Sequence, residues 1–392
     1  MSKQLIDRSP DLSRLRGDGY DITAAAGHLY VRDIPYVNAN RQIKRGVLIS
    51  TLSTAGDASV RPDSHVAYFQ GEQPCSADGR PIEGIQNPTA PPQGLGANLT
   101  FSAKPMPTGA YEDYYDKVTA YVAILSGPAQ QIDPLVSART FPPIATEEGD
   151  GSPFCYMDTA SSRAEITHVA RKLSNLRIAI VGVGGTGSYV LDLVAKTPVG
   201  EIHLFDHDDF LSHNAFRCPG APSLEELRAR PRKAFYLKGI YGRMHRGIVD
   251  HEDFLTSGNS ELLRGIDYVF LCVDRGPVRQ LVVEKVEEFG GSLIDVGMGL
   301  GLTDDALGGI LRVTASTPRQ REHFRGRVSF AVADDHGEYS SNIQIADLNA
   351  LNAALAVIKW KKLCGFYLDL EQEYTSTYTI DGNHLANVDH LV

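Results

Sequence analysis

The sequence predicts an α/β protein in two parts: a doubly wound parallel sheet in the second half, and a smaller α+β domain before it. Three observations support this. Strand-like and helix-like segments alternate after about residue 150, as in parallel sheets with helices on both faces. The earlier residues form short apolar runs between stretches rich in Pro and Gly. A chain of 392 residues is also long for one domain, so we expect domains over 1–150 and 151–392.

In the first domain, the sequence allows two strands, one helix, a loop and a linker to be placed. Residues 46–52 and 65–69 are rich in β-branched and aromatic side chains and are predicted strands. Residues 111–125 have the spacing of an amphipathic helix with a Tyr-rich face. Prolines and glycines predict a loop over 87–96 and a linker over 142–153.

In the second domain, the predicted elements follow one another in the order of a parallel sheet. Short apolar runs indicate buried strands, which cover 177–181, 201–206, 267–273 and 292–296. Helical spacing predicts helices over 188–196, 277–289 and 343–363, and a last strand covers 375–380. The helix over 343–363 is apolar enough to pack on the sheet or at a dimer interface.

A glycine-rich segment, Gly-Val-Gly-Gly-Thr-Gly over 182–187, lies where the first of these strands turns into a helix. At such a turn the backbone can approach a phosphate, and the free N–H groups and the helix dipole hold it. We therefore expect Gly182, Gly184, Gly185 and Gly187 to bind a nucleotide. On its own this Rossmann-like pattern is shared with dinucleotide-binding dehydrogenases, so an NAD-dependent oxidoreductase stays an open alternative.

The charged residues downstream favour a triphosphate over a dinucleotide. Asp206 ends the next strand about 20 residues later, where a carboxylate binds ribose hydroxyls, and Asp208 stands beside it. Arg217 and Lys233 are cations suited to neutralising a triphosphate, and Asp274 follows a strand where it can hold Mg²⁺. Hydride transfer has no need of such a set, whereas breaking a phosphoanhydride does. The expected cofactors are ATP and Mg²⁺.

With these residues in place, the chain resembles a known family over about half its length. Residues 163–365 resemble the adenylation domain of the ThiF/MoeB and ubiquitin-activating enzyme family, through the glycine loop, the spacing of Asp206, Asn214 and Arg217, Lys233, Asp274 and the end of the last helix. The resemblance implies a ThiF-type adenylation domain with a Rossmann-like doubly wound sheet. It also implies a reaction in which the C-terminal glycine carboxylate of a ubiquitin-like protein attacks the α-phosphate of ATP, forming an acyl-adenylate and releasing pyrophosphate.

The same resemblance implies a role for each candidate catalytic residue. Asn214 would orient the phosphates, and Arg217 and Lys233 would stabilise the charge that develops on them. Asp274 would coordinate Mg²⁺. Family members often supply an arginine across a homodimer, and Arg163 is the candidate here, with Arg171 as the alternative. The chain keeps the Arg, Lys and Asp that non-catalytic family members have usually lost, so a binding partner without activity is the weaker alternative.

Residues 1–150 more loosely resemble a domain that precedes ThiF domains in bacterial operons. These operons also encode a ubiquitin-like protein, a conjugating enzyme and a peptidase, and some act in antiviral defence. The resemblance is carried by residues 65–71, 74–75, 78–79 and 104–115. It implies that the first domain binds the carrier protein or another partner.

The five cysteines form no C-x-x-C pair, which argues against a structural zinc site and a disulfide framework. Many family members carry a cysteine that accepts the activated protein as a thioester. Cys218, beside the positive Arg217, and Cys75, in a loop-like context, would be the candidates for such a thioester. No cysteine lies in a clear crossover-loop context, so we expect the adenylate to pass directly to a conjugating enzyme.

Composition excludes some further classes of function. The net charge is −10 with no basic block, which disfavours nucleic acid as a partner. No apolar run reaches membrane-spanning length and the N-terminus has no signal-peptide core, so a cytoplasmic protein without a membrane partner is expected. The motifs alone leave open that a small peptide or a tRNA base is adenylated instead of a protein.

Overall fold

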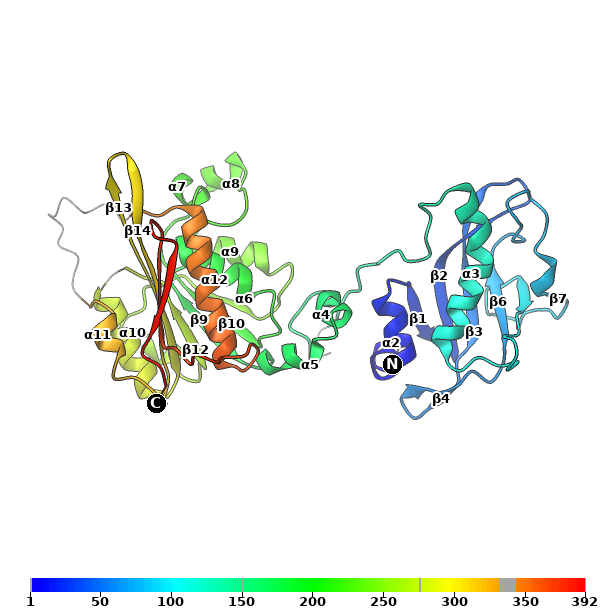
Figure 1. Cartoon of the computed structure of the whole chain (residues 1–392), viewed down its shortest axis with the longest axis horizontal. Coiled ribbons are helices and arrows are strands. Elements are labelled where there is room, and N and C mark those ends of the chain that lie inside the picture. The colour runs from blue at the N-terminus through cyan, green and yellow to red at the C-terminus, as the bar shows by residue number, and fades with distance from the viewer. Residues whose placement is uncertain (1, 148, 150, 275, 331–342, 392) are drawn as a thin grey trace. The chain divides into compact units, whose positions relative to one another are not determined.

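The computed structural model describes the chain except for residues 1, 148, 150, 275, 331–342 and 392. The chain divides into two compact units, Met1–Ile144 and Ala145–Val392. The α/β class, with an antiparallel-sheet unit before a parallel-containing sheet, is confirmed (Figure 1). Among the described helices, none is both long and apolar enough to span a membrane.

The first unit is an antiparallel sheet covered by helices. Its strands have the order β1-β2-β3-β6-β8-β7, with bounds β1 Ile22–Ala25, β2 His28–Val37, β3 Ile43–Thr51, β6 Val66–Gln70, β7 Gln86–Asn87 and β8 Leu99–Ser102. A separate short hairpin joins β4 Thr54–Ala55 to β5 Ala58–Ser59. The helices are α1 Ser2–Arg8, α2 Pro10–Gly17, η1 Glu83–Ile85 and α3 Tyr114–Ile132.

Helix α3 supplies much of the core of this unit. It begins three residues after the predicted start and continues past Pro128. The Tyr-rich face is core, because Tyr114 and Tyr121 are fully buried. Lys117 is buried between them, and its Nζ donates to Ser50 Oγ at 2.7 Å and to the carbonyl oxygens of residues 64 and 66 at 2.8 Å. Burial lowers the pKa of Lys117 to about 8.

The second unit is an eight-stranded sheet of order β11-β10-β9-β12-β13-β14-β15-β16. The first five strands are parallel and the last three antiparallel. The bounds are β9 Arg177–Val181, β10 Glu201–Phe205, β11 Ile248–His251, β12 Tyr268–Leu271, β13 Ser292–Thr303, β14 Ala306–Ser316, β15 Thr375–Thr379 and β16 His384–Val388.

Helices cover both faces of this sheet (Figure 1). One face packs on α6 Gly185–Val194, α9 Lys233–Tyr241 and α12 Ala346–Leu363, and the other on α10 Gly276–Glu288 and α11 Phe324–Arg327. Along β9, Ile178 and Ile180 enter the first core, and Ala179 and Val181 the second. The shorter helices are α4 Thr159–Arg163, α5 Thr167–Ala170, η2 Arg171–Leu173, α7 Ser212–Ala215, α8 Leu224–Ala229 and η3 Ser260–Leu263.

Three differences between the second unit and the prediction matter here. The helix predicted over 188–196 begins at Gly185, so three residues of the glycine segment form its first turn. The strand predicted over 292–296 continues to Thr303 and pairs with β14 as a long hairpin. The last predicted strand is followed by β16, which the sequence analysis missed.

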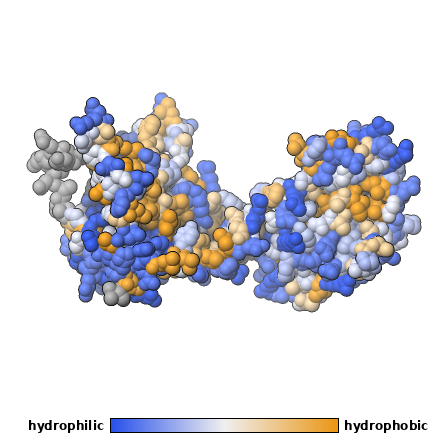
Figure 2. Space-filling view, in the orientation of Figure 1, coloured by the Kyte–Doolittle hydropathy of each residue, from blue (hydrophilic) through white to orange (hydrophobic). Residues whose placement is uncertain are grey.

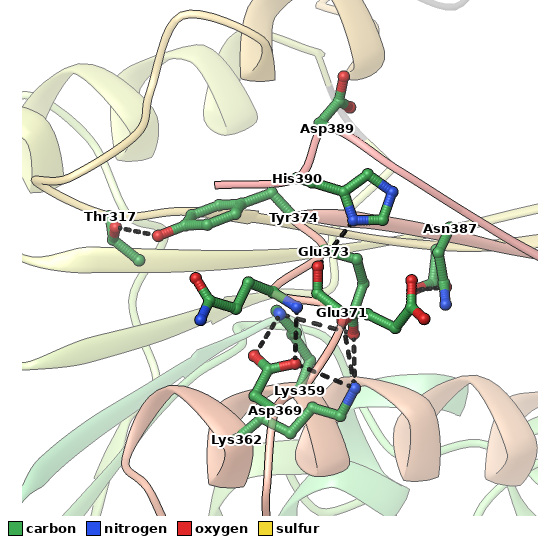
Figure 3. A network of polar contacts seen from close by, with 12 residues as sticks. Thr317, Lys359, Lys362, Asp369, Glu371, Glu373, Tyr374, Asn387, Asp389 and His390 are labelled. Carbon is green, nitrogen blue, oxygen red and sulfur yellow. Dashed lines mark hydrogen bonds and ion pairs between the residues drawn. The ribbon is translucent and has the colours of Figure 1, made fainter. Parts of the chain in front are cut away.

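An ion-pair network links residues 369–373, which follow α12, to two lysines of that helix (Figure 3). Lys359 lies 3.2 Å from Asp369 and 3.5 Å from Glu373, and Lys362 lies 3.3 and 3.0 Å from the same two carboxylates. Lys359 and Glu373 are each only 4% exposed. Burial favours a higher pKa for Asp369, but the two ammonium groups outweigh it and hold this pKa below its usual value.

We predict that Lys117 makes the stability of the first unit increase with pH in the alkaline range. The folded unit releases the proton near pH 8, whereas the unfolded chain keeps it up to about pH 10.4. The unfolded state therefore binds more protons in between, and the free energy of unfolding should rise with pH by at most roughly 3 kcal/mol. Denaturant unfolding between pH 7.5 and 10 tests this. Lys117→Met should abolish the rise, and an equal rise in that variant would contradict the assignment.

We also predict that Lys359→Met destabilises the second unit by about 3 kcal/mol, because it leaves a buried carboxylate with one cation fewer. The matched control is Lys285→Met, whose partner Glu288 has a side chain 55% exposed, and which should cost below about 1 kcal/mol. Thermal and denaturant unfolding of both variants measure the difference. Equal losses would show that the buried network contributes no more than a surface ion pair.

Candidate active site

The glycine segment forms a tight turn that opens onto a helix N-terminus. The chain leaves β9 and turns at Gly182, where φ is +86° and a Cβ would lie 2.8 Å from the Cys272 carbonyl oxygen. A Cβ at Gly187 would lie 1.9 Å from the Gly182 carbonyl oxygen. Only glycine fits at these two positions. At Gly184, the N-cap of α6, a Cβ would meet nothing within 4 Å. The turn therefore leaves open space where the N–H groups of the helix face outward.

A cavity of about 190 Å³ lies at this turn, beyond the carboxyl ends of the parallel strands. β9 pairs with β10 on one side and β12 on the other, so this is where the strand order reverses and where open α/β sheets bind ligands. Most of the predicted site residues line the cavity together: Gly182, Gly184, Gly185, Asp206, Asp208, Arg217, Lys233 and Asp274. Segments nearly 100 residues apart in the sequence thus meet at one place.

Asp206 is the most constrained of these side chains. One carboxylate oxygen accepts the Val183 N–H at 2.9 Å, and the other accepts the Asp208 N–H at 3.0 Å. The side chain is 8% exposed. Burial raises the pKa of Asp206, and the nearby Lys233 ammonium opposes that rise. Each carboxylate oxygen has a further lone pair, so the group can still accept a ribose hydroxyl.

Lys233 begins α9 and places its ammonium between two carboxylates. Its Nζ lies 2.8 Å from Asp208 Oδ2 and 3.8 Å from Asp206 Oδ1. Ligand atoms of Asp206, His207 and Asp208 also come within 4.8 Å of one another, the spacing of a metal site. Because the ammonium already neutralises two of these three groups, they do not favour a metal ion there. Asp274, predicted to hold Mg²⁺, is exposed at the mouth of the pocket beyond β12.

Arg217 and Asn214 leave buried donors without partners. Arg217 lines the pocket, and its buried Nε has no hydrogen-bond partner among the described atoms. Asn214 is fully buried; its Oδ1 accepts the Leu211 N–H at 2.9 Å, and its Nδ2 likewise lacks a described partner. Buried unpaired donors are costly. A cationic donor that faces an open phosphate cradle fits the nucleotide expected there.

Asn214 and Arg163 do not join the residues that line the described pocket. Asn214 holds the turn that carries Arg217, whose N–H donates to the Asn214 carbonyl at 3.0 Å. Its action on a bound phosphate would therefore pass through Arg217, which differs from the direct contact predicted. Arg163 is the last residue of α4. Gly187 also lies outside the lining and serves the close packing of the turn.

The sequence analysis missed one wall of the pocket. Asp253, Phe254 and Leu255 follow β11, and Gln344 precedes α12, and all four line the cavity. The rings of Phe254 and His207 stack with centroids 3.1 Å apart. The rule that ligands bind beyond the carboxyl ends of strands could have identified the segment after β11. No comparable signal marks Gln344.

The two cysteine candidates are buried. Cys218 is 5% exposed, and its thiol donates to the Gly184 carbonyl at 3.4 Å; burial raises its pKa. Cys218 therefore lacks the exposure that a thioester role needs, because the turn after Arg217 folds against the glycine loop. Cys75 is fully buried in the first unit, and burial raises its pKa as well. Thiolate chemistry needs exposure and a lowered pKa, and neither residue has them.

Comparison with known proteins matches two family models to this chain. Residues 162–301 match the ThiF family, and residues 10–159 match a domain of unknown function, DUF6791. Ubiquitin-like modifier-activating enzyme 5 of Oryza sativa is 25% identical over 198 residues, 47% of this chain and 46% of that protein. The tRNA threonylcarbamoyladenosine dehydratase of Haemophilus influenzae is 28% identical over 137 residues, 34% of this chain and 51% of that protein.

The chain therefore spans about half the length of these curated relatives. A crystal structure of E. coli MccB with MccA-N7isoASN shares 17% identity with a TM-score of 0.45, over 59% of this chain and 70% of that one. The family match covers the glycine loop, β10, the Arg217 and Lys233 segments and β12. Residues 162–301, which supply every described lining residue of the pocket except Gln344, are a ThiF family domain, and a DUF6791 domain precedes it.

Proposed function

We propose that this protein uses ATP to adenylate a carboxylate. The observation that carries the proposal is the pocket itself, where an open phosphate cradle, the unpaired Arg217 donor, Lys233 and Asp274 come together. A carboxylate oxygen would bond to the α-phosphorus while the bond from that phosphorus to the bridging oxygen breaks. The electron pair of the broken bond leaves with pyrophosphate, and the product is an acyl-adenylate.

The residues of the chain supply binding and charge to this step. The N–H groups at the start of α6 would hold phosphate oxygens, and Asp206 would accept a ribose hydroxyl. Arg217 and Lys233 would stabilise the negative charge that moves toward the leaving pyrophosphate. The exposed carboxylate of Asp274 is suited to holding Mg²⁺, which would neutralise phosphate charge when bound.

The proposed substrate is a ubiquitin-like protein that ends in glycine. Its support is the similarity to a ubiquitin-like modifier-activating enzyme over the ThiF domain. The burial of Cys75 and Cys218 supports direct transfer of the adenylate to a conjugating enzyme. We propose that the first unit binds one of these partners, as the resemblance to domains of bacterial ubiquitin-like operons, some of them antiviral, suggests. A second candidate is a carboxylate on tRNA, since one relative is named a tRNA threonylcarbamoyladenosine dehydratase.

The first prediction of this proposal concerns nucleotide and metal. Exchange of labelled pyrophosphate into ATP should require Mg²⁺ and a partner protein with a free C-terminal carboxylate. Asp274→Ala should reduce exchange by about 100-fold or more, because a charge contact of the transition state is lost. The matched control is Glu284→Ala, an exposed carboxylate on α10 outside the pocket, which should exchange normally. Full activity of Asp274→Ala would refute the metal assignment, and tighter binding of NAD than ATP would revive the oxidoreductase alternative.

The second prediction is a homodimer. Apolar side chains reach the surface of the second unit (Figure 2). On α12, Leu351 and Ile358 lie about two turns apart on one side of the helix and are 36% and 42% exposed. Light scattering at micromolar concentration should show a dimer, and replacing both residues by Glu should give monomers.

Mixed Arg163→Ala and Asp274→Ala protomers should regain part of the exchange activity. A wild-type monomer would contradict the dimer, and mixed dimers without recovery would contradict the role of Arg163 across it.

A further inference from the structure

Helix α12 contributes a buried amide to the back of the nucleotide pocket. Asn349 lies in the first turn of the helix and is 0% exposed. α12 packs along α6, the helix that begins at the glycine loop. Asn349 does not line the cavity among its described residues. Any effect on a bound nucleotide must therefore act through the residues that Asn349 contacts.

The Asn349 amide joins two segments that do line the cavity. Its Oδ1 accepts a hydrogen bond from Thr186 Oγ1 at 3.0 Å, in the first turn of α6. Its Nδ2 donates to the Arg217 carbonyl oxygen at 3.2 Å. One side chain thus satisfies a donor of the phosphate loop and an acceptor of the segment that carries the cation.

The loop is shaped to receive this amide. A Cβ on Gly185 would lie 2.2 Å from Asn349 Nδ2 and 2.6 Å from Gln344 Oε1. The amide therefore occupies the space that any other residue at position 185 would fill. Cys218 makes a second link between the same two segments through its contact with the Gly184 carbonyl.

We propose that Asn349 is a positioning residue that fixes the distance between the phosphate loop and Arg217. The inference rests on the proposed adenylation, because its consequence is the binding of ATP. The loop would hold the phosphates, and Arg217, which lines the same cavity, would contact them as well. A displacement of about 1 Å between such groups is enough to lower catalysis strongly. Asn349 bonds to both segments at once, and its amide lies between them.

The same helix provides a matched control. Asn352 is also 0% exposed, and its Nδ2 donates to the Gly297 carbonyl oxygen at 3.0 Å. That bond leads to β13 and not to the phosphate loop. Asn349→Ala and Asn352→Ala each remove one buried amide and one bond to a backbone carbonyl, and Asn349→Ala also removes the bond from Thr186. Asn349→Ala should therefore cost somewhat more stability, but it alone should change the pocket.

The experiment compares full-length wild type, Asn349→Ala and Asn352→Ala in two measurements. The first is the rate at which maleimide labels Cys218 in the nucleotide-free protein, read from the Cys218 peptide by mass spectrometry. The second is the dependence of pyrophosphate exchange on ATP concentration. Asn349→Ala should label Cys218 faster and should raise the KM for ATP about tenfold, with a further fall in kcat. Asn352→Ala should match wild type in both.

Several outcomes would overturn the inference. Asn349→Ala could match Asn352→Ala in both measurements, or it could label faster with no change in the KM for ATP. An equal fall in the rate of pyrophosphate exchange in both variants would assign the effect to lost stability. A wild-type protein that neither binds ATP nor exchanges pyrophosphate would instead refute the proposed function, and the positioning role with it. The wild-type result therefore separates the two failures.

Discussion

The nucleotide pocket depends on one buried carboxylate. Asp206 accepts the N–H of Val183 in the glycine loop and the N–H of Asp208 beyond β10, and the ammonium of Lys233 lies 3.8 Å away. An isolated carboxylate at this depth would be costly, so these three partners and Asp206 stabilise one another. The carboxyl ends of β9 and β10 and the start of α9 are thereby fixed around a single group. These contacts of Asp206 hold the three segments around the cavity.

The sequence predicted those parts of the fold whose pattern is local. The apolar run over 177–181 coincides with β9, because every residue from 178 to 181 is buried. The extension of β13 beyond Val296 was not predicted, because residues 297–303 are glycine-rich and none of them is buried. β14 was missed although Leu311, Val313 and Ala315 alternate with polar residues there. β16 likewise contains no buried residue. Such strands are defined by pairing to a neighbour and not by the side chains that they bury.

The candidate site shows the same division. Asp206, Arg217, Lys233 and Asp274 line one pocket. Asp206 and Asp274 follow strands and Lys233 begins α9 at one edge of the parallel sheet, and Arg217 lies in the turn after α7. The burial of Cys218 was not predictable, because it depends on how the turn after Arg217 packs on the glycine loop. Asn349 was missed for a similar reason. Its contacts are 132 residues or more away in the chain and arise only when α12 packs on α6.

The charges on the wall of the pocket decide in what form a nucleotide can enter. The described residues that line the pocket include four Asp side chains but only two from Arg or Lys. They are Asp206, Asp208, Asp253 and Asp274, and Arg217 and Lys233. Lys233 is already engaged by two of those carboxylates. A bare triphosphate would thus approach a wall of its own sign. We expect the empty pocket to discriminate against free nucleotide and to admit one whose charge a divalent cation has already masked.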